Sequence, residues 1–328
     1  MFKNNKISVV IPAYNEEKSI ASVILTVPSF VDHVLVVNDG STDQTTEIAK
    51  ERGAILINHV INKGVGAAFR SGVRKSLELN SDIMVNMDAD GQFNSEDITK
   101  LIEPIIEKRA DFVTASRFKN PDFYPQMSRI KFIGNRLMSW LISNLVGQKY
   151  YDVSCGFRAY SKEALLRLNL FGEFTYTQET FLDLAFKGMS IVEVPVLVRG
   201  TREYGQSKVA SNLFNYTYQT LKIILRTLRD YRIFKVFSFI SSFFLLIGVV
   251  FGSFSLIYYL RFNFFSPYKW VAFAAGFSIL FSLLTIMAGF IIDIFSRIRY
   301  NQEETLYQIK KIIFLKNNQR VDTPDYKL

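Results

Sequence analysis

The sequence predicts an α/β fold with a mainly parallel sheet, followed by a C-terminal hairpin of two transmembrane helices. Three observations lead to this prediction. Short apolar segments alternate with segments of helical pattern through the first half of the chain, as expected for a parallel sheet that helices cover on both faces. Two long segments near the C-terminus contain no charged residue. Acidic residues follow directly after two of the predicted strands.

The apolar segments with the length and composition of buried strands are Ile7–Pro12, Val34–Asn38, Ala54–His59, Ile83–Met87, Phe112–Ala115 and Ile191–Val198. The segments between the first five of them carry a helical pattern: Glu16–Thr26, Asp43–Arg52, Val65–Leu79 and Ser95–Lys108. Polar residues typical of helix N-caps stand near the start of two of these helices, at Ser41–Asp43 and Asn94–Glu96. The alternation therefore predicts a sheet that Ile191–Val198 extends.

Val236–Leu260 and Trp270–Ile292 are the two uncharged segments, and each exceeds the roughly 20 helical residues that cross a bilayer. A pair of buried core helices is the alternative, but ordinary globular helices are shorter. Only Arg261–Lys269 separates the segments, so they predict a hairpin whose flanks lie on the same side of the membrane. The flanks carry the basic residues Lys222, Arg226, Arg229, Arg232, Lys235, Arg297 and Arg299. The positive-inside rule then places both flanks in the cytoplasm.

The composition excludes several classes of protein. The formal charge is +9, from 39 Lys and Arg against 30 Asp and Glu, which suits a nucleic acid, a membrane surface or an anionic substrate. The basic residues gather near the spans rather than in a recognition element, so nucleic acid is not expected. The single cysteine, Cys155, excludes an intrachain disulfide and indicates a buried thiol in a reducing compartment. Two histidines do not supply a His-rich zinc site. Met1–Lys6 leads into the first strand without a signal-peptide pattern.

Two further segments have the pattern of basic amphipathic helices, Ile130–Leu145 and Leu213–Tyr231. Such helices either lie in the headgroup layer of a membrane or pack on a sheet, and both interpretations remain open. After the second span, Glu303–Leu315 predicts another helix. Asp293, at the end of that span, stands four residues before Arg297, so we expect an ion pair rather than a functional acid.

The strand ends carry the residue types of a nucleotide site. Pro12 is expected to end the first strand, and Tyr14 and Glu16, just beyond it, suit a flat base and a ribose. Asp39 follows the second strand and suits the same ligands. Each of these alone also fits a capped turn. Gly64 opens a helix, where a glycine-rich loop suits an anion, but the motif is neither GxGxxG nor a P-loop. We expect Gly64 to pack closely beneath a ligand.

Asp88 and Asp90 stop the fourth apolar strand, and Gln92 follows. In an extended segment these alternate residues would point to one side. Carboxylate and amide oxygens suit Mg²⁺ or Mn²⁺, with phosphates and water completing the shell. Open α/β sheets bind ligands at this carboxyl edge. The motif therefore predicts a divalent cation that holds a diphosphate.

These motifs stand in one order: VIPAYNEE, VNDGSTD, NKGVGAA, MDADGQ, ASRF, DVSCGFRAY and EVPVLVRGTREYGQSK. With this order the sequence resembles the family 2 glycosyltransferases of the GT-A fold, the fold of nucleotide-diphospho-sugar transferases. Within that family it is most similar to the polyprenyl-phosphate glycosyltransferases, the group that contains dolichyl-phosphate mannose synthase. The resemblance covers about residues 6–210.

The resemblance implies the following roles: nucleotide binding by Pro12, Tyr14, Glu16 and Asp39, metal binding by Asp88, Asp90 and Gln92, contact with the lipid phosphate by Arg117 and Arg129, and closure of a loop on the donor diphosphate by Arg202 and Lys208. Lys131 is a further cation for the acceptor phosphate. Ile133 stands where the family often has a serine for that phosphate, which leaves the acceptor site less defined than the donor site.

A phosphate acceptor changes the chemistry that the site needs. An alcohol needs a general base, whereas a phosphate monoester, with a second pKa of about 6, is already anionic. The Thr-Glu-Asp and Gln-x-x-Arg-Trp strings of sugar-polymerising relatives do not occur here, and the region of the first reads Tyr176–Glu179. This argues against a processive synthase. Glu179 is the candidate base if the acceptor is an alcohol, and Asp152 is either a site residue or a turn cap.

The sequence thus predicts an enzyme that moves a hexose, with inversion, from a UDP-, GDP- or dTDP-sugar to a polyprenyl phosphate. The expected parts are a catalytic domain over residues 1–210, an amphipathic juxtamembrane helix over 211–235, two spans over 236–295 and a cytoplasmic tail over 296–328. Two alternatives remain: a membrane glycosyltransferase with a hydroxyl acceptor, and an inactive scaffold in a membrane glycan complex. Membrane lipid is an expected partner, and a homo-oligomer is compatible with the sequence.

Overall fold

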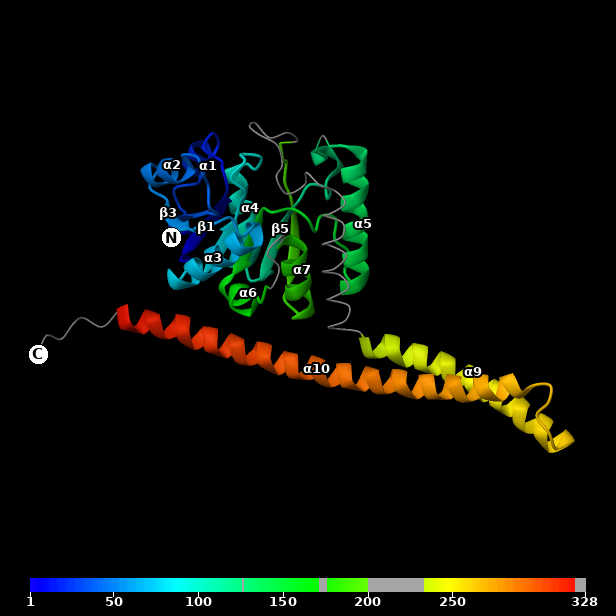
Figure 1. Cartoon of the computed structure of the whole chain (residues 1–328). Helices are drawn as coiled ribbons and strands as arrows, with labels where there is room; N and C mark the ends of the chain where they lie inside the picture. The colour runs from blue at the N-terminus through cyan, green and yellow to red at the C-terminus, as the bar shows by residue number, and fades with distance from the viewer. Residues whose placement is uncertain (126, 171–175, 200–232, 322–328) are drawn as a thin grey trace, which may run out of the picture. The chain divides into compact units, whose positions relative to one another are not determined.

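The computed structural model describes residues 1–125, 127–170, 176–199 and 233–321 (Figure 1). It divides the chain into two compact units, which are described separately. The first comprises Met1–Ile223 together with Leu306–Leu328, and the second comprises Ile224–Thr305.

The first unit is built on a seven-stranded sheet in the order β3-β2-β1-β4-β6-β5-β7, counted over the described part of the chain. The strands are β1 Ile7–Ala13, β2 His33–Asn38, β3 Ile55–Asn58, β4 Ile83–Asn86, β5 Phe112–Ser116, β6 Arg158–Ser161 and β7 Ile191–Pro195. β6 pairs antiparallel with β4 and β5, while the other neighbours pair in parallel. The mainly parallel α/β sheet expected from the sequence is confirmed.

The helices of this unit are α1 Ile20–Thr26, α2 Thr45–Glu51, α3 Val65–Glu78, α4 Ile98–Ile106, α5 Arg129–Val146, α6 Lys162–Arg167 and α7 Thr177–Phe186, with short 3₁₀ turns η1 Ser95–Asp97 and η2 Pro121–Phe123. The helix expected from Glu16 begins only at Ile20, after a turn in which the Glu16 carbonyl accepts from the Ser19 and Ile20 amides. The other predicted helices of the first half lie within a few residues of their expected ends.

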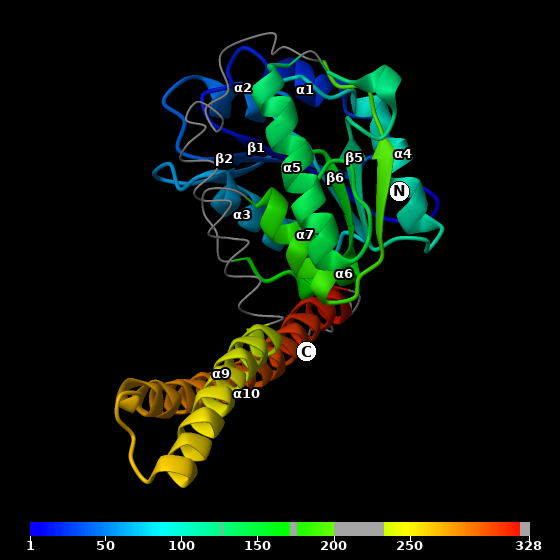
Figure 2. The same ribbon diagram turned by 90° about the vertical axis from the view of Figure 1, so that its right-hand side faces the viewer.

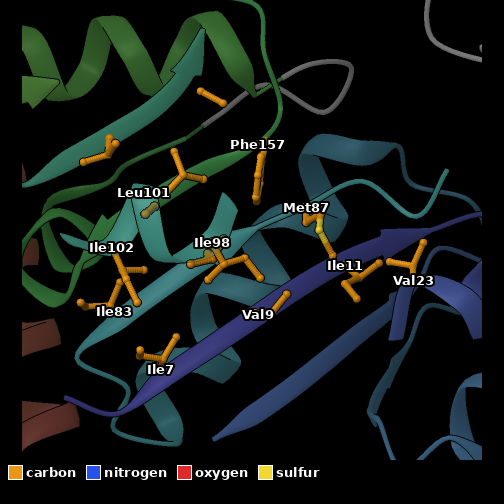
Figure 3. Close-up of a cluster of buried hydrophobic side chains, with 14 of the residues drawn as sticks. Ile7, Val9, Ile11, Val23, Ile83, Met87, Ile98, Leu101, Ile102 and Phe157 are labelled. Carbon is orange, nitrogen blue, oxygen red and sulfur yellow. The ribbon is translucent and has the colours of Figure 1, made fainter. Parts of the chain in front are cut away.

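Apolar side chains on the two faces of the sheet form two separate cores. On one face, β1 and β4 pack against α1 and α4 through residues such as Val9, Ile98 and Leu101 (Figure 3). On the other face, α3, α5, α6 and α7 cover the sheet (Figure 2). Gly72 lets α3 approach β1 closely, since a Cβ there would lie 2.3 Å from Val10 Cγ1.

β6 was not predicted from the sequence. Arg158–Ser161 spans four residues and begins with an arginine, so it lacks the apolar pattern that identified the other strands. The strand is nevertheless buried, because the Arg158 guanidinium satisfies its donors internally. It bonds the carbonyl oxygens of Val153, Cys155 and Thr177.

The expectation that Pro12 ends the first strand was wrong. Pro12 lies inside β1 and pairs with Val37 of β2, and the ladder continues to Ala13. On the β4 side, pairing stops at Val10. A proline nitrogen has no proton to donate, so Pro12 limits only the ladder with β4.

The order of strands places a topological switch between β1 and β4. The chain proceeds from β1 to β2 and β3 on one side, then returns to β4 on the other. Ligands of open α/β sheets bind at the carboxyl ends of strands beside such a switch. The segments that follow β1, β2 and β4 therefore share this edge, and they carry the nucleotide and metal residues expected from the sequence.

The second unit contains a helical hairpin. It is formed by α9 Ile233–Phe262 and the first part of α10 Lys269–Val321. Ser241 and Ser282 bond each other's carbonyl oxygens at 3.0 and 2.8 Å, and Gly248 packs against Ile279. Small residues that let helices approach are typical of membrane interfaces.

Val236–Phe262 and Lys269–Phe314 are long and apolar enough to cross a membrane, and only 17% and 22% of their most apolar windows are buried. Core helices of a soluble protein would be mostly covered. The predicted helix Glu303–Leu315 is not a separate helix, because α10 continues through it to Val321. Asp293 pairs with Arg297, as expected, and Arg299 pairs with Glu303. These pairs support the continuous helix, and no glycine or proline interrupts residues 293–321.

Candidate active site

The turn after β1 is fastened to the turn after β2. Asn15 adopts a left-handed conformation with φ +53°, which asparagine tolerates better than most residues. Its backbone N–H donates to Ser41 Oγ at 2.9 Å, and its side-chain Oδ1 accepts from the Thr42 N–H at 2.8 Å. The Glu16 N–H donates to Thr45 Oγ1 at 2.9 Å. Tyr14 and Glu16 are both half-buried, and these bonds fix the backbone that carries them at the sheet edge.

Asp39 is held more tightly than the sequence indicated. It is 4% exposed, and its carboxylate accepts from the N–H groups of Lys63 and Gly64 at 3.0 and 2.8 Å. Its Oδ1 also lies 2.7 Å from His59 Nδ1. The structure thus brings Asp39 and Gly64 together. Sequence reasoning missed His59, although its position as the last residue of the third predicted strand was a signal.

Gly64 has φ +89° and ψ 157° as the N-cap of α3, a conformation that is open essentially only to glycine. This conformation presents its N–H to Asp39. The backbone conformation therefore requires a glycine at this position. The close packing under a ligand that we expected stays a prediction.

Asp88, Asp90 and Gln92 do not lie in an extended segment, so the alternation from which we inferred a common side was wrong. β4 ends at Asn86, and the chain turns through Gly91 with φ +71°. Asp90 is 4% exposed, and its Oδ1 accepts from the Gln92 N–H at 3.1 Å. An aspartate bonding two residues ahead is a turn-forming device. The turn, rather than strand alternation, brings the Asp90 side chain to the backbone of Gln92.

Gln92 connects this turn to the segment after β7. Its Nε2 donates to the Arg199 carbonyl at 3.0 Å, and the Arg199 N–H donates to the Gln92 carbonyl at 3.1 Å. The segment after β7 therefore passes beside the acidic turn at Arg199. Arg202, Lys208 and the helix expected over Leu213–Tyr231 lie outside the described residues.

The oxygen donors fit a hard divalent cation. The described residues contain no group of three or more His, Cys, Asp or Glu side chains that could hold a metal. Asp88, Asp90 and the amide oxygen of Gln92 would therefore supply only part of a shell, and a diphosphate and water would supply the rest. Such a shell suits Mg²⁺ or Mn²⁺, which bind few protein ligands and keep substrate phosphates and water.

Arg117 is paired with Asp152. The carboxylate of Asp152 is fully buried, and it accepts from Arg117 Nε at 2.7 Å and Nη2 at 2.9 Å. Burial opposes ionisation of Asp152, but the adjacent guanidinium and its hydrogen bonds hold the pKa of the carboxyl below its usual value. Arg117 Nη2 also donates to Ser154 Oγ at 2.8 Å. Asp152 is thus an ion-pair partner, a role that the sequence did not indicate.

An apolar groove lies along the start of α5. It has a volume of about 360 Å³ and is lined by Tyr124, Pro125, Met127, Arg129, Phe132 and Ile133. The buried Phe118 ring contacts the rings of Tyr124 and Phe132 and lies 5.3 Å from the Arg117 guanidinium. Phe118 therefore connects the lining of the groove to the Arg117 guanidinium, and Ile133 forms part of that lining.

Arg129 and Lys131 are exposed in the first turn of α5, which Ser128 caps. A helix N-terminus already favours an anion, and two cations there strengthen the preference. Glu179 lies half-buried in the first turn of α7. The structure thus provides a sheet edge with carboxylates and an apolar groove with Arg129 in its lining.

Comparisons with known proteins give a consistent result. Residues 8–168 match the model of "Glycosyl transferase family 2". The chain is 40% identical over 177 residues to a UDP-N-acetylglucosamine–dolichyl-phosphate N-acetylglucosaminyltransferase of Methanococcus voltae, covering 48% of this chain and 70% of that protein. It is 30% identical over 224 residues to an undecaprenyl-phosphate mannosyltransferase of Micrococcus luteus, covering 63% and 89%.

A solved structure shares the fold. Glucosyl-3-phosphoglycerate synthase of Mycobacterium tuberculosis, in complex with Mn²⁺, UDP-glucose and phosphoglyceric acid, superposes with a TM-score of 0.56 at 22% identity. The match covers 68% of this chain and 80% of that chain.

Proposed function

The chain belongs to glycosyl transferase family 2 and has the GT-A fold, and from this premise we propose that it transfers a hexose from a nucleotide-sugar to a polyprenyl phosphate. One observation carries the choice of acceptor. An apolar groove lined by Tyr124, Phe132 and Ile133 has Arg129 at its side, at the N-terminus of α5. This combination suits a ligand with a hydrocarbon chain and an anionic head. The relatives named for dolichyl and undecaprenyl phosphate support the proposal.

The donor would bind at the edge formed by the ends of β1, β2 and β4. Tyr14, Glu16 and Asp39 would hold the base and ribose of a UDP-, GDP- or dTDP-hexose. Asp88, Asp90 and Gln92 would hold Mg²⁺ or Mn²⁺ against the diphosphate. When bound, the cation supplies electrostatic stabilisation to the diphosphate leaving group. Arg202 and Lys208 are proposed to add positive charge there.

The acceptor phosphate would be oriented by Arg129 and Lys131, with the ion-paired Arg117 behind the groove. Because a phosphate monoester is already ionised at neutral pH, it can attack the anomeric carbon without a general base. Direct displacement from the opposite side inverts that carbon. The residues of this chain then have two tasks: they align the phosphate oxygen with the anomeric carbon, and they stabilise charge on the leaving group.

The membrane helices would keep the enzyme beside its lipid substrate. The basic flanks of the hairpin favour a catalytic unit in the cytoplasm, the compartment in which nucleotide-sugars are made. This side of the membrane is part of the proposal, as are a catalytic domain that begins with residues 1–210 and two spans within residues 236–295.

The test is an assay of purified membranes with a panel of nucleotide-sugars and either undecaprenyl or dolichyl phosphate. We expect a polyprenyl-phospho-sugar product that requires Mg²⁺ or Mn²⁺. Asp90→Asn should lower kcat by about 100-fold or more. Arg129→Ala should raise KM for the lipid phosphate about tenfold, the loss of one charge-assisted hydrogen bond. Arg74→Ala removes an exposed arginine of α3 and is the matched control.

Transfer only to hydroxyl acceptors, with activity lost in Glu179→Gln, would contradict the phosphate mechanism and favour the half-buried Glu179 as a general base. A protein that binds no nucleotide with either cation would be a scaffold instead of an enzyme.

A further inference from the structure

The carboxylate of Asp88 lies directly against the backbone of Gly156. A Cβ at Gly156 would stand 2.9 Å from Asp88 Oδ2 and 3.0 Å from Oδ1. Real Cβ atoms do not approach oxygen this closely. Gly156 is therefore a flat wall that limits where the Asp88 carboxylate can lie, and any side chain in its place would displace the carboxylate.

Hydrogen bonds between buried side chains hold this wall in place. Asn86, at the end of β4, donates from Nδ2 to the Gly156 carbonyl at 3.0 Å and to Tyr176 Oη at 2.6 Å. Tyr176 is 2% exposed, and its ring stacks on Phe69 with centroids 4.2 Å apart. Its hydroxyl also donates to the Gly156 carbonyl at 3.3 Å. The strand that leads to Asp88 is thus tied to the wall that confines Asp88.

The segment that contains Gly156 is also fixed from its other side. The fully buried Arg158 donates to the carbonyl oxygens of Val153 and Cys155, which lie on either side of the turn that precedes Gly156. It also bonds the Thr177 carbonyl at the start of α7. A guanidinium with several fixed donors stiffens a loop in this way. The wall therefore resists movement when a side chain is added, and the Asp88 side chain has to move instead.

We propose that Gly156 is a positioning residue for Asp88, held by Asn86, Tyr176 and Arg158, so that the Asp88 carboxylate meets the cation–nucleotide complex in one orientation. This inference rests on the proposed function, because it assumes that Asp88 contacts that complex. Groups that orient a ligating side chain commonly change metal affinity by about 10- to 100-fold when they are altered.

Gly156→Ala tests this directly, with calorimetric binding of UDP, GDP and dTDP in the presence of Mn²⁺ as the readout. The affinity should fall about tenfold or more, while the thermal unfolding of the metal-free protein changes little, because the displaced group is the end of one side chain. Gly276→Ala is the matched control, since a Cβ there meets no atom within 4 Å. It should bind like the wild-type protein.

A double-mutant cycle separates positioning from a general structural effect. In an Asp88→Ala background, Gly156→Ala should weaken binding no further, because the group that it displaces is gone. Tyr176→Phe keeps the ring stacked on Phe69 and removes only the hydroxyl, so it tests the network if Gly156→Ala does not fold. It too should weaken Mn²⁺-dependent binding, and Asp88→Ala should abolish the effect.

Two results would overturn the proposal: Gly156→Ala binding within about twofold of wild type, or equal weakening with and without Asp88, which is the signature of independent sites. A wild-type protein that binds none of UDP, GDP and dTDP with Mn²⁺ would remove the proposed function as well. Wild-type binding that Gly156→Ala leaves unchanged would remove the positioning role alone.

Discussion

Two arginines that the sequence assigned to one phosphate have different surroundings. Arg117 is mostly covered and holds the buried Asp152, whereas Arg129 is exposed beside the groove. Both were expected at the phosphate because the resemblance to the family 2 glycosyltransferases implied it. The sequence did not indicate the pairing, since Arg117 and Asp152 are separated by 35 residues and meet only after β5 and the segment before β6 are assembled.

We expect Arg117→Ala to destabilise the fold and Arg129→Ala to leave stability unchanged. Removing Arg117 leaves a buried carboxylate unpaired, at a cost of about 3–5 kcal/mol, while exposed substitutions change stability by about 0.5 kcal/mol or less. The pKa of Asp152 is lowered in the folded state, so the pair contributes its full stability above the ordinary pKa of 3.8 and loses it as the pH falls through the lower, folded-state pKa. Denaturant unfolding at pH 7 and at pH 3 measures both effects.

Equal stability of Arg117→Ala and Arg129→Ala at pH 7 would contradict the structural role of the ion pair. In that case both arginines would be available to the substrate.

Cys155 should be chemically inert in the native protein. Burial raises the pKa of its thiol to about 12, and the residue is 2% exposed, so almost no thiolate forms at pH 8 and reagents do not reach it. Iodoacetamide should label the native protein negligibly and the urea-unfolded protein once per chain. Rapid labelling of the native form at pH 8 would show that the segment around Gly156 opens.

Among the elements, sequence patterns located those that are buried through their own apolar side chains. The strands with continuous apolar residues were predicted within one or two residues of their ends, apart from Ile191–Val198, which stops at Pro195. β6 was missed because its burial depends on hydrogen bonds that Arg158 makes to distant carbonyls. The length of α10 was missed because the change from apolar to charged residues near Asp293 resembles a helix end, although nothing stops the backbone helix there.

The last part of α10, from Leu306, belongs to the catalytic unit. Tyr307 is 6% exposed and donates to Glu163 Oε2 at 3.1 Å, and the Arg167 guanidinium lies 4.1 Å from its ring centroid. Lys310 Nζ donates to the Leu168 carbonyl at the C-cap of α6 at 2.7 Å. A lysine at this helix end also complements the helix dipole. This segment is therefore part of the fold of the catalytic unit rather than a loose tail.

Tyr307→Ala should accordingly lower the stability of the catalytic unit by about 3–5 kcal/mol, the usual cost of deleting a buried ring. Ile312→Ala, in the same helix but 54% exposed, should change it much less. Unfolding of the detergent-solubilised protein, followed by the near-UV signal of the catalytic unit, compares the two. Equal effects would show that the α10 segment does not support α6 in solution.

At the scale of the whole molecule, the sequence predicted the mainly parallel sheet and the two long apolar helices that the structure contains. The apolar segments are long, contiguous and flanked by charge, and these properties need no tertiary structure to be seen. The details of the site were less accessible, because they depend on contacts between segments that are distant in the chain. Asp39 meets the turn before α3, Gln92 meets Arg199 after β7, and Asp88 meets Gly156 before β6.

The membrane arrangement leads to a final prediction: the turn between the spans and the end of the second span lie on opposite sides. Ser266, between the helices, and Thr305, beyond the apolar stretch of α10, are both exposed. Because native Cys155 is buried, Ser266→Cys and Thr305→Cys each provide one reactive thiol. A membrane-impermeant maleimide should label Ser266→Cys in intact cells and Thr305→Cys only after permeabilisation. Labelling of both, or of Thr305→Cys alone, in intact cells would contradict a cytoplasmic catalytic unit. The segment from Leu306 belongs to that unit, so residue 305 is expected on the same side of the membrane as the catalytic unit.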